Sequence, residues 1–183
     1  TSSPHPWFAP GSPPVILGVG RLTKLKDFFL LIRAFAKVRI QRTCRLMILG
    51  EGELREELED LVKKLGLESD VTLPGFVENP YFYMSRAAVF VLSSQQEGLP
   101  NVLIQALACG CPVVSTDCPS GPSEILENGK WGRLVPVGDV DALAEAVLAT
   151  LKENTHPDVV SRARDFCVSQ AATQYLDVLG MHI

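Results

Sequence analysis

The chain has 183 residues, of which 46% are hydrophobic and 21% are charged, and its formal net charge is −4. This composition is typical of a globular domain with a full core, and it excludes an intrinsically disordered protein. The slight acidic balance argues against binding of nucleic acid through a basic face. Because the sequence shows neither an apolar run of membrane-spanning length nor a secretory leader, we expect it in the cytoplasm or at the inner face of the membrane.

Three segments of different composition follow one another along the chain. Residues 1–13 are rich in proline and serine and begin with threonine rather than methionine. We therefore expect a linker or a cut end here, and a chain that is a fragment of a longer protein. Residues 14–155 carry the pattern of one domain. Residues 156–183 form a predicted helical tail, in which the helical pattern runs from 158 to 179.

Short apolar runs predict six strands, and amphipathic stretches between them predict helices. The strands are expected at residues 15–19, 45–49, 71–73, 89–92, 112–115 and 133–135. One helix begins near Asp27 as N-cap, and the next begins at Glu53, carries Leu65 on its inward face and ends at Gly66. Further helical segments are expected at 81–83, 100–110, 122–127 and 140–152. This alternation predicts an α/β fold: a doubly wound, Rossmann-like parallel sheet of about six strands with helices on both faces.

Ligands of such a sheet bind beyond the carboxyl ends of its strands. The first loop at that edge carries two cations, Arg21 and Lys26, five residues apart. Both could reach a single phosphate group, the arginine as a planar fork and the lysine as a point charge. Two solvated surface charges are an equally good interpretation of this spacing.

The loop and helix at residues 94–110 form the second candidate feature. The amides of Gly98, Leu99, Asn101 and Val102 could make an anion site at the start of a helix. Glu97 lies beside them, where it could accept hydrogen bonds from the hydroxyls of a sugar attached to the phosphate. It could equally cap the helix that follows. Gln105, one turn into that helix, is by itself best interpreted as a solvated position.

Other kinds of site find less support. The five cysteines are scattered and odd in number, which suits a reducing compartment, and their spacing matches no four-ligand zinc pattern. The three histidines fall in the linker and the tail, so a histidine base is not expected within this domain. The glycines at 18 and 20 lack the third glycine of a dinucleotide-binding fingerprint, so a dehydrogenase is disfavoured.

Several short motifs occur in the order in which one enzyme family carries them. Together they resemble the C-terminal, donor-binding half of the large group 1 family of retaining glycosyltransferases with the GT-B fold. The motifs are Gly20-Arg-Leu with Lys26, Gly50-Glu-Gly52, Pro74-Gly-Phe-Val77, Ser94-Gln-Gln-Glu-Gly98, Ala106-Leu-Ala-Cys-Gly-Cys-Pro-Val-Val114, Gly121-Pro-Ser-Glu124, Asn128-Gly129 and Gly132-Arg-Leu-Val-Pro136 with Gly138-Asp139.

The resemblance implies roles for individual residues. Arg21 and Lys26 would neutralise the donor diphosphate without a metal ion, and Glu97 would contact the transferred sugar; these three are the catalytic candidates. The loop at Phe76 and Val77 would border the base, largely through its backbone. The whole implied donor-binding set is Gly20, Arg21, Lys26, Gly52, Phe76, Val77, Glu97, Gly98, Leu99, Asn101, Val102 and Gln105.

One position departs from the family pattern. A second glutamate is expected eight positions after Glu97, to bind the ribose hydroxyls, but this chain has Gln105 there. A glutamine can still bond a diol, although it lacks the charge-assisted bond, which is worth about 1–2 kcal/mol more than a neutral one. We therefore expect a weaker ribose contact that Gln105→Glu should strengthen.

The function that the resemblance implies is donor binding in a metal-independent bacterial glycosyltransferase of polysaccharide biosynthesis. It would move a sugar, most often from a UDP-sugar, to a glycan or lipid-linked acceptor, with no cofactor and no nucleic acid. An N-terminal acceptor domain of the same protein would complete the enzyme and could associate with a membrane, so the domain at 14–155 should be inactive alone. The alternatives are a catalytically silent α/β interaction module and another GT-B enzyme, such as a nucleotide-sugar epimerase or a phosphorylase.

Overall fold

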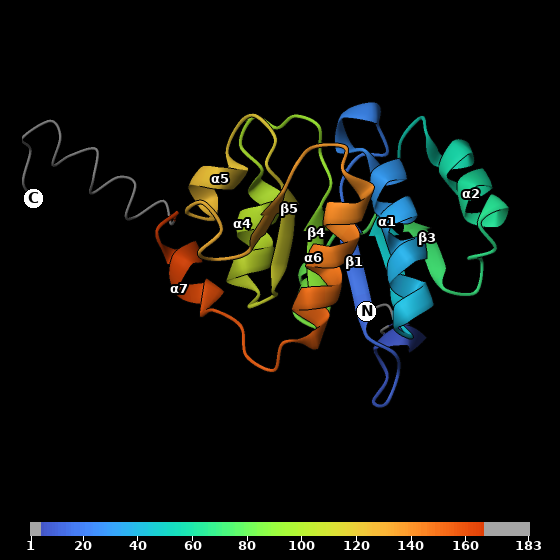
Figure 1. The fold of residues 1–183 in the computed structure, drawn as a ribbon, viewed down its shortest axis with the longest axis horizontal. Helices are drawn as coiled ribbons and strands as arrows, with labels where there is room; N and C mark the ends of the chain where they lie inside the picture. Colours follow the sequence, from blue (N-terminus) through green and yellow to red (C-terminus); the bar gives the residue numbers. More distant parts are fainter. Residues whose placement is uncertain (1–4, 167–183) are drawn as a thin grey trace, which may run out of the picture.

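The computed structural model describes residues 5–166, which form a single parallel sheet covered by helices on both faces (Figure 1). The strand order is β3-β2-β1-β4-β5-β6, and each neighbouring pair is parallel. The predicted fold class is confirmed. The strands are β1 Val15–Val19, β2 Arg45–Leu49, β3 Val71–Gly75, β4 Val89–Leu92, β5 Val113–Thr116 and β6 Arg133–Val135.

Two of the long helices begin where the sequence supplies a capping carboxylate. The Asp27 carboxylate accepts from the Leu30 amide at 3.1 Å, and that of Asp139 accepts from the Ala142 amide at 2.9 Å, so both predicted N-caps are confirmed. The helices are α1 Phe28–Gln41, α2 Arg55–Lys64, α3 Tyr81–Met84, α4 Asn101–Ala108, α5 Pro122–Ile125, α6 Val140–Lys152 and α7 Val159–Arg164, with 3-10 turns η1 Pro6–Phe8 and η2 Lys24–Lys26.

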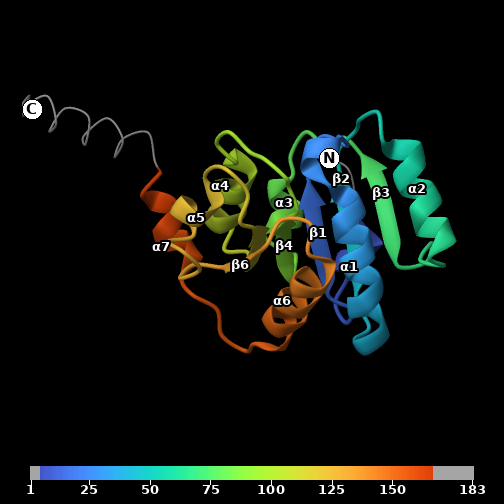
Figure 2. The same cartoon turned by 45° about the horizontal axis from the view of Figure 1, so that its top comes forward.

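Two apolar cores lie on the two faces of the sheet, because alternate strand residues point to opposite sides. One core packs α1, α2 and α6 against one set of strand residues, such as Ile16 and Val91. The other packs α3, α4, α5 and α7 against the intervening set, such as Leu17 and Phe90. In Figures 1 and 2, α1 and α6 run side by side over the first of these faces.

The second helix departs from its prediction at both ends. It begins at Arg55 rather than at Glu53, and it ends at Lys64. Leu65 is 40% exposed, so its predicted inward position is wrong. The reason is that Gly66 turns the chain with a φ of +65°, and Leu67 fills the apolar space instead.

The two ends of the described chain also pack onto the second core. Phe8 meets Phe82 and Tyr83 edge to face, with ring centroids 6.2 and 5.6 Å apart, so this part of the expected linker is packed on the domain. At the other end, Arg162 of α7 donates to the carbonyls of Glu124 and Ile125, each at 2.8 Å. α7 forms the first part of the predicted helical tail and ends at Arg164, and residues 167–179 of that prediction lie outside the described residues.

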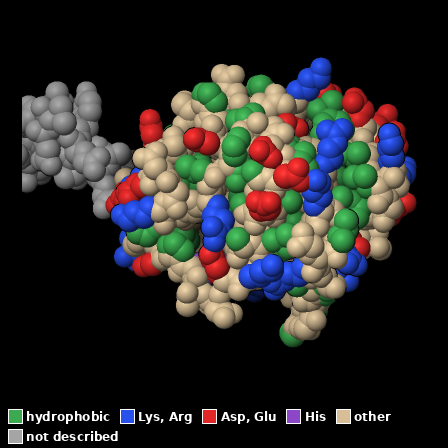
Figure 3. Space-filling view, viewed as in Figure 1, with side chains coloured by type: hydrophobic (Ala, Val, Ile, Leu, Met, Phe, Trp, Pro, Cys, Tyr) green, Lys and Arg blue, Asp and Glu red, His purple; other side chains and the backbone are tan. Residues whose placement is uncertain are grey.

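Charges of both signs are interspersed over the face that α1 and α6 cover (Figure 3). Several of these side chains are paired, such as Lys37 with Asp141 between the two helices. Within residues 5–166, no helix combines the length and the apolar character needed to cross a bilayer.

The strand order creates a switch point between β1 and β4. From β1 the sheet grows through β2 and β3 in one direction, and from β4 it grows through β5 and β6 in the other. The loops that leave the carboxyl ends of these two central strands are residues 20–27 and 93–100. Because ligands of doubly wound sheets bind at such a point, the candidate site is sought there.

Candidate functional site

Glycines allow the loops after β1 and β2 to lie against each other. The Leu22 amide donates to the Glu51 carbonyl at 2.9 Å, which holds the two backbones together. Gly50 has a φ of +144°, and a Cβ there would stand 1.9 Å from the Gly20 carbonyl oxygen. A Cβ on Gly52 would stand 2.5 Å from the Leu22 oxygen. Neither position can carry a side chain without moving the loop.

The loops after β1 and β4 are joined by an ion pair. The Lys26 ammonium lies 2.5 Å from Oε1 of Glu97, and the Ser94 hydroxyl donates to the same oxygen at 2.5 Å. The Glu97 side chain is 8% exposed and Ser94 is fully buried. Among the described residues nothing donates to Oε2, so that oxygen is available to a ligand.

Further hydrogen bonds fix this loop against the first one. The Ser93 hydroxyl donates to the Lys26 carbonyl at 2.8 Å, and the Gln95 amide donates to the Leu25 carbonyl at 2.8 Å. The Gln95 side chain also donates to Asp27, the residue that caps α1. These hydrogen bonds therefore fix the distance between the loop that carries Lys26 and the loop that carries Glu97.

A second set of backbone bonds fixes the same loop on its other side. The Glu97 amide donates to the Pro119 carbonyl at 2.8 Å, and the Ser120 amide donates back to the Glu97 carbonyl at 3.0 Å. Gly121 follows with a φ of +103°, and a Cβ on it would stand 2.7 Å from Cδ of Pro100. The loop after β5 thus fixes the backbone at Glu97 and packs against Pro100.

The start of α4 leaves most of its predicted anion-binding amides free. The hydrogen bonds of the described chain include no acceptor for the amides of Gly98, Leu99 and Val102. The Asn101 amide differs, because it donates to the Leu99 carbonyl at 2.8 Å. This bond closes an inverse γ-turn at Pro100, whose φ and ψ are −76° and 73°. Three of the four predicted amides are therefore open to an anion, and the fourth is already used.

Two cavities open at this edge of the sheet and meet at Arg21 and Glu53. We call the first, of about 710 Å³, the Phe76 cavity; it is lined by Val19, Gly20, Arg21, Leu49, Gly50, Glu51, Gly52, Glu53, Phe76, Val77, Glu78, Pro80, Tyr81 and Gln105. We call the second, of about 690 Å³, the Lys26 cavity; it is lined by Arg21, Thr23, Lys24, Leu25, Lys26, Glu53, Leu54, Gln96, Glu97 and Gly98.

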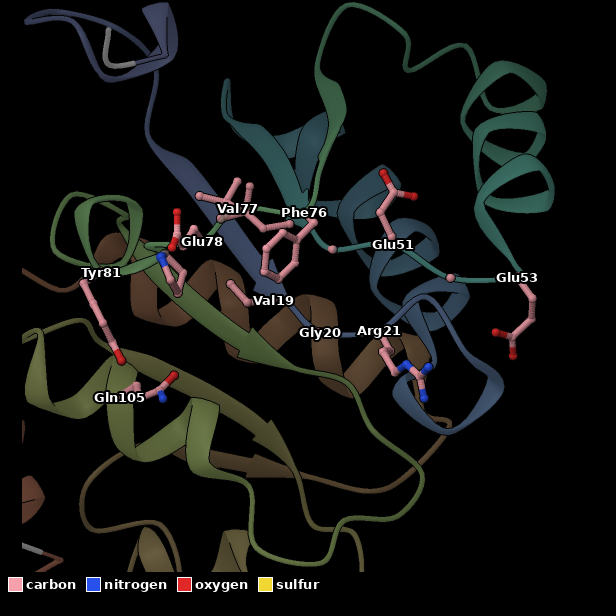
Figure 4. A pocket seen from close by; sticks show the side chains of 14 residues that line it. Val19, Gly20, Arg21, Glu51, Glu53, Phe76, Val77, Glu78, Tyr81 and Gln105 are labelled. Carbon is pink, nitrogen blue, oxygen red and sulfur yellow. The ribbon is translucent and has the colours of Figure 1, made fainter. Parts of the chain in front are cut away.

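The Phe76 cavity is open and largely apolar in its middle (Figure 4). The Phe76 ring, 77% exposed, points into it toward Val19 and Gly20. Tyr81 and Gln105 lie at one end and Arg21 at the other. Glu51 points away from the cavity, because Arg55 binds both of its oxygens at 2.7 and 2.8 Å. These bonds hold the pKa of the Glu51 carboxyl below its ordinary value.

Most of the predicted site residues line one of the two cavities. Gly20, Gly52, Phe76, Val77 and Gln105 line the first, Lys26, Glu97 and Gly98 line the second, and Arg21 lines both. Leu99, Asn101 and Val102 line neither. Tyr81 and Glu53 also line the first cavity and were not among the predicted site residues. Their one signal was position, since each directly follows a predicted loop at the carboxyl edge of the sheet.

The cysteines of the described chain are free thiols. Burial raises the pKa of Cys44 to about 11 and that of Cys111 to about 12, so both thiols stay protonated and unreactive at neutral pH. In residues 5–166 no three His, Cys, Asp or Glu side chains come together as a metal site.

Comparison with known families gives a match over nearly the whole chain. The family described as glycosyl transferases group 1 matches residues 3–165. The chain belongs to this family. The match spans the loops after β1 and β4, and with them the residues of both cavities.

This group 1 glycosyltransferase domain has relatives in bacterial glycan synthesis. It is 45% identical over 139 residues to the Campylobacter jejuni N-acetylgalactosamine-N,N'-diacetylbacillosaminyl-diphospho-undecaprenol 4-alpha-N-acetylgalactosaminyltransferase, covering 76% of the chain and 38% of that enzyme. It is 37% identical over 174 residues to the putative colanic acid biosynthesis glycosyltransferase WcaL of Escherichia coli, covering 89% and 43%. The chain thus spans about two fifths of the length of these relatives.

Solved structures show the same fold. Anabaena HepE in complex with UDP superposes with a TM-score of 0.82 at 24% identity, covering 93% of this chain and 49% of that one. The lipopolysaccharide outer core galactosyltransferase WaaB superposes with a TM-score of 0.82, covering 93% and 50%. The fold is therefore that of one half of a GT-B glycosyltransferase, in keeping with the expected C-terminal half.

Proposed function

We propose that this domain binds a nucleoside diphosphate sugar and forms the donor half of a retaining glycosyltransferase that acts on a glycan or lipid-linked acceptor. The observation that carries the proposal is the pair of cavities that meet at Arg21, on the switch point of the sheet. A nucleotide and a sugar joined by a diphosphate need two neighbouring spaces with positive charge between them. A ligand of that form would use both cavities and the cation at their junction.

The donor divides between the cavities according to their chemistry. The base and ribose occupy the Phe76 cavity, where the exposed ring of Phe76 offers apolar surface and Val77 offers its backbone. The diphosphate crosses at Arg21, whose guanidinium can bind two phosphate oxygens at once. The sugar enters the Lys26 cavity, where the free Oε2 of Glu97 accepts hydrogen bonds from its hydroxyls.

The residues then act by stabilising charge. The bond between the anomeric carbon and the phosphate oxygen breaks, its electron pair stays on the phosphate, and the sugar becomes oxocarbenium-like. Arg21 and Lys26 stabilise the negative charge that grows on the leaving diphosphate, more strongly in the transition state than in the bound donor. Lys26 carries three N–H groups, so it can donate to phosphate while it keeps its contact with Glu97. No metal ion is required for this role.

The relatives support a choice of donor and acceptor to test first. The Campylobacter jejuni relative is named as an N-acetylgalactosaminyltransferase that acts on a diphospho-undecaprenol saccharide. HepE is solved with UDP. We therefore take UDP-N-acetylgalactosamine as the first donor and a lipid-linked saccharide as the first acceptor class. An N-terminal domain of the same protein would hold that acceptor at the cytoplasmic face of a membrane, and residues 14–155 alone would bind donor and transfer little sugar.

The proposal is tested by calorimetric titration of the 183-residue chain with UDP, GDP and ADP. At least one diphosphate should bind, and Arg21→Ala combined with Lys26→Ala should weaken it at least about a hundredfold, because two charge-assisted contacts are lost. The matched control combines Arg33→Ala with Lys63→Ala. It removes the same charge from exposed positions on α1 and α2, outside both cavities, and should change affinity less than twofold.

Two results would contradict the proposal in different ways. Tight binding that survives the double substitution at Arg21 and Lys26 would show that the phosphate lies elsewhere. No binding of any diphosphate to the unsubstituted chain would favour the silent interaction module, in which the sheet is kept without its ligand.

A further inference from the structure

The last residue of β5 carries a buried hydroxyl that reaches the loop after β4. Thr116 is fully buried, and the backbone pairing of β4 with β5 ends one position earlier, at Leu92 and Ser115. Beyond that point the Thr116 hydroxyl donates to the Ser94 carbonyl at 2.6 Å. The Leu92 carbonyl lies farther from it, at 3.4 Å, and a hydroxyl has a single proton to donate. A side-chain bond therefore holds the loop where the strand pairing has stopped.

Ser94 joins this hydroxyl to Glu97. Among the described residues, Thr116 is the one donor to the Ser94 carbonyl, and the Ser94 hydroxyl donates to Oε1 of Glu97 at 2.5 Å. Ser94 is fully buried and lines neither cavity, so solvent does not compete for either bond. With its carbonyl and its hydroxyl both bonded, the residue has a fixed orientation. A continuous path of buried hydrogen bonds thus runs from the end of β5 to the carboxylate.

The path matters because the other donor to Glu97 has a second task. Lys26 also contacts Oε1, but its side chain is 24% exposed, and its ammonium is the group proposed to meet a phosphate. A lysine ammonium is a point charge on a flexible stem, so it imposes little direction on a carboxylate. A binding side chain is held precisely only when further hydrogen bonds fix its own orientation. For Glu97 the buried hydroxyls supply that direction, and they keep it when the lysine turns toward phosphate.

A second buried threonine shows what an ordinary bond of this kind looks like. Thr150 is 4% exposed, and its hydroxyl donates to the Ala146 carbonyl at 2.9 Å, one turn earlier in α6. That bond satisfies the hydroxyl within its own helix and leads to neither cavity. The Thr116 bond instead spans 22 positions and ends at a residue that itself bonds Glu97. Burial alone therefore does not account for the place of the Thr116 hydroxyl.

We propose that Thr116 is a positioning residue for sugar recognition: it holds Ser94 so that the Ser94 hydroxyl fixes Oε1 of Glu97 and leaves Oε2 free for the sugar. Thr116 lines neither cavity and acts only through Ser94. This inference rests on the proposed function, because it takes Glu97 to contact the sugar of a nucleoside diphosphate sugar.

The test compares UDP with UDP-N-acetylgalactosamine by calorimetric titration of the 183-residue chain. Thr116→Val should weaken the sugar nucleotide about fivefold, as expected for one lost hydrogen bond, and should change UDP affinity less than about twofold. Thr116→Ala repeats the loss of the hydroxyl without the added methyl group, which would stand close to the Ser94 carbonyl in the valine variant. Thr116→Ser keeps the hydroxyl and should leave both affinities within about twofold. The matched control is Thr150→Val, which makes the same change at the buried threonine of α6 and should change neither affinity.

A double substitution tests the path itself. Because Thr116 acts through the Ser94 hydroxyl, Thr116→Val added to Ser94→Ala should weaken the sugar nucleotide by less than about a further twofold. A further loss of about fivefold would show that Thr116 acts by another route, and it would overturn the inference.

The remaining outcomes separate this inference from the proposed function. If the hydroxyl-free variants weaken UDP and its sugar conjugate equally, or weaken neither, Thr116 does not position Glu97, although the nucleotide site stands. If the unsubstituted chain binds GDP or ADP rather than UDP, that diphosphate and its glucose conjugate replace the uridine pair, with the same expectations. If it binds none of the three diphosphates, the proposed function fails and this inference fails with it.

Discussion

The Lys26 cavity and the Phe76 cavity open at the same edge of the sheet, but their side chains are held very differently. In the first, Lys26, Ser94 and Glu97 are bonded to one another, and backbone bonds fix their loops on both sides. In the second, Phe76 is 77% exposed and Tyr81 is 48% exposed. The charged groups are preorganised by the protein, whereas the aromatic side chains of the other cavity are left open to solvent. Under the proposed function, the preorganised groups lie where charge would develop and the open apolar wall lies where a base would only be bound.

The largest expected effect concerns the wall of the Phe76 cavity, which Gly50 lines. Gly50→Ala should lower the free energy of unfolding by at least about 3 kcal/mol, because its Cβ would overlap the Gly20 carbonyl and its φ is unfavourable for alanine. Urea denaturation followed by circular dichroism measures this. Gly138→Ala is the matched control, since Gly138 also has a positive φ but open space around it, and it should lose only about 1–2 kcal/mol. Equal losses for the two variants would show that the two loops are not in the contact described.

A smaller effect concerns ligand affinity, and it should distinguish the Lys26 cavity, proposed to hold the sugar, from the Phe76 cavity, proposed to hold the nucleotide. Ser94→Ala removes one of the two donors to Glu97 Oε1, so the carboxylate is less well oriented toward a sugar. We expect the affinity for UDP-N-acetylgalactosamine to fall about fivefold while that for UDP changes less than twofold. Calorimetry measures both. Ser85→Ala, which removes an exposed hydroxyl bonded to the Phe82 carbonyl, should leave both affinities unchanged. A parallel fall in UDP affinity after Ser94→Ala would mean that the two cavities are not held independently.

The smallest effect concerns pH. The pKa of Glu51 is depressed in the folded chain by its bonds to Arg55, so this pair stabilises the fold above the ordinary carboxyl pKa of 4.5 and loses its effect as the pH falls through the depressed value. Glu51→Gln should therefore lower stability slightly at pH 7 and have no effect at the acid end, as read by thermal denaturation across pH. A difference that persists in acid would show that Glu51 acts through packing rather than through charge. Glu68→Gln, at an exposed residue after α2, is the control.

The sequence predicted what depends on local pattern. The six strands follow from apolar runs, and the starts of α1 and α6 follow from Asp27 and Asp139, because a capping side chain bonds to its own helix. The wrong prediction for Leu65 is also local. The apolar periodicity of the helix was extended to Leu65, but α2 ends at Lys64 and Gly66 turns the chain. Such an error concerns where an element ends, not whether it exists.

The internal geometry of the site could not be predicted, because it depends on residues far apart in the sequence. The sequence predicts Lys26 at phosphate and Glu97 at sugar, but it does not predict the ion pair between them, which spans 71 positions. The Asn101 amide is likewise predicted to be free, whereas Pro100 turns that amide back onto the Leu99 carbonyl. Tyr81 was passed over because an aromatic turn has the same pattern whether it faces a core or a cavity.

The 71 positions between Lys26 and Glu97 also bear on when the site can form as the chain folds. Contacts of high sequence separation require chain closure first, so they are made after local ones. The first loop can form its turn early, but its cation meets the carboxylate only once β4 has paired beside β1. A partly folded chain that holds β1, β2 and β3 would thus have much of the wall of the Phe76 cavity but not the ion pair between Lys26 and Glu97.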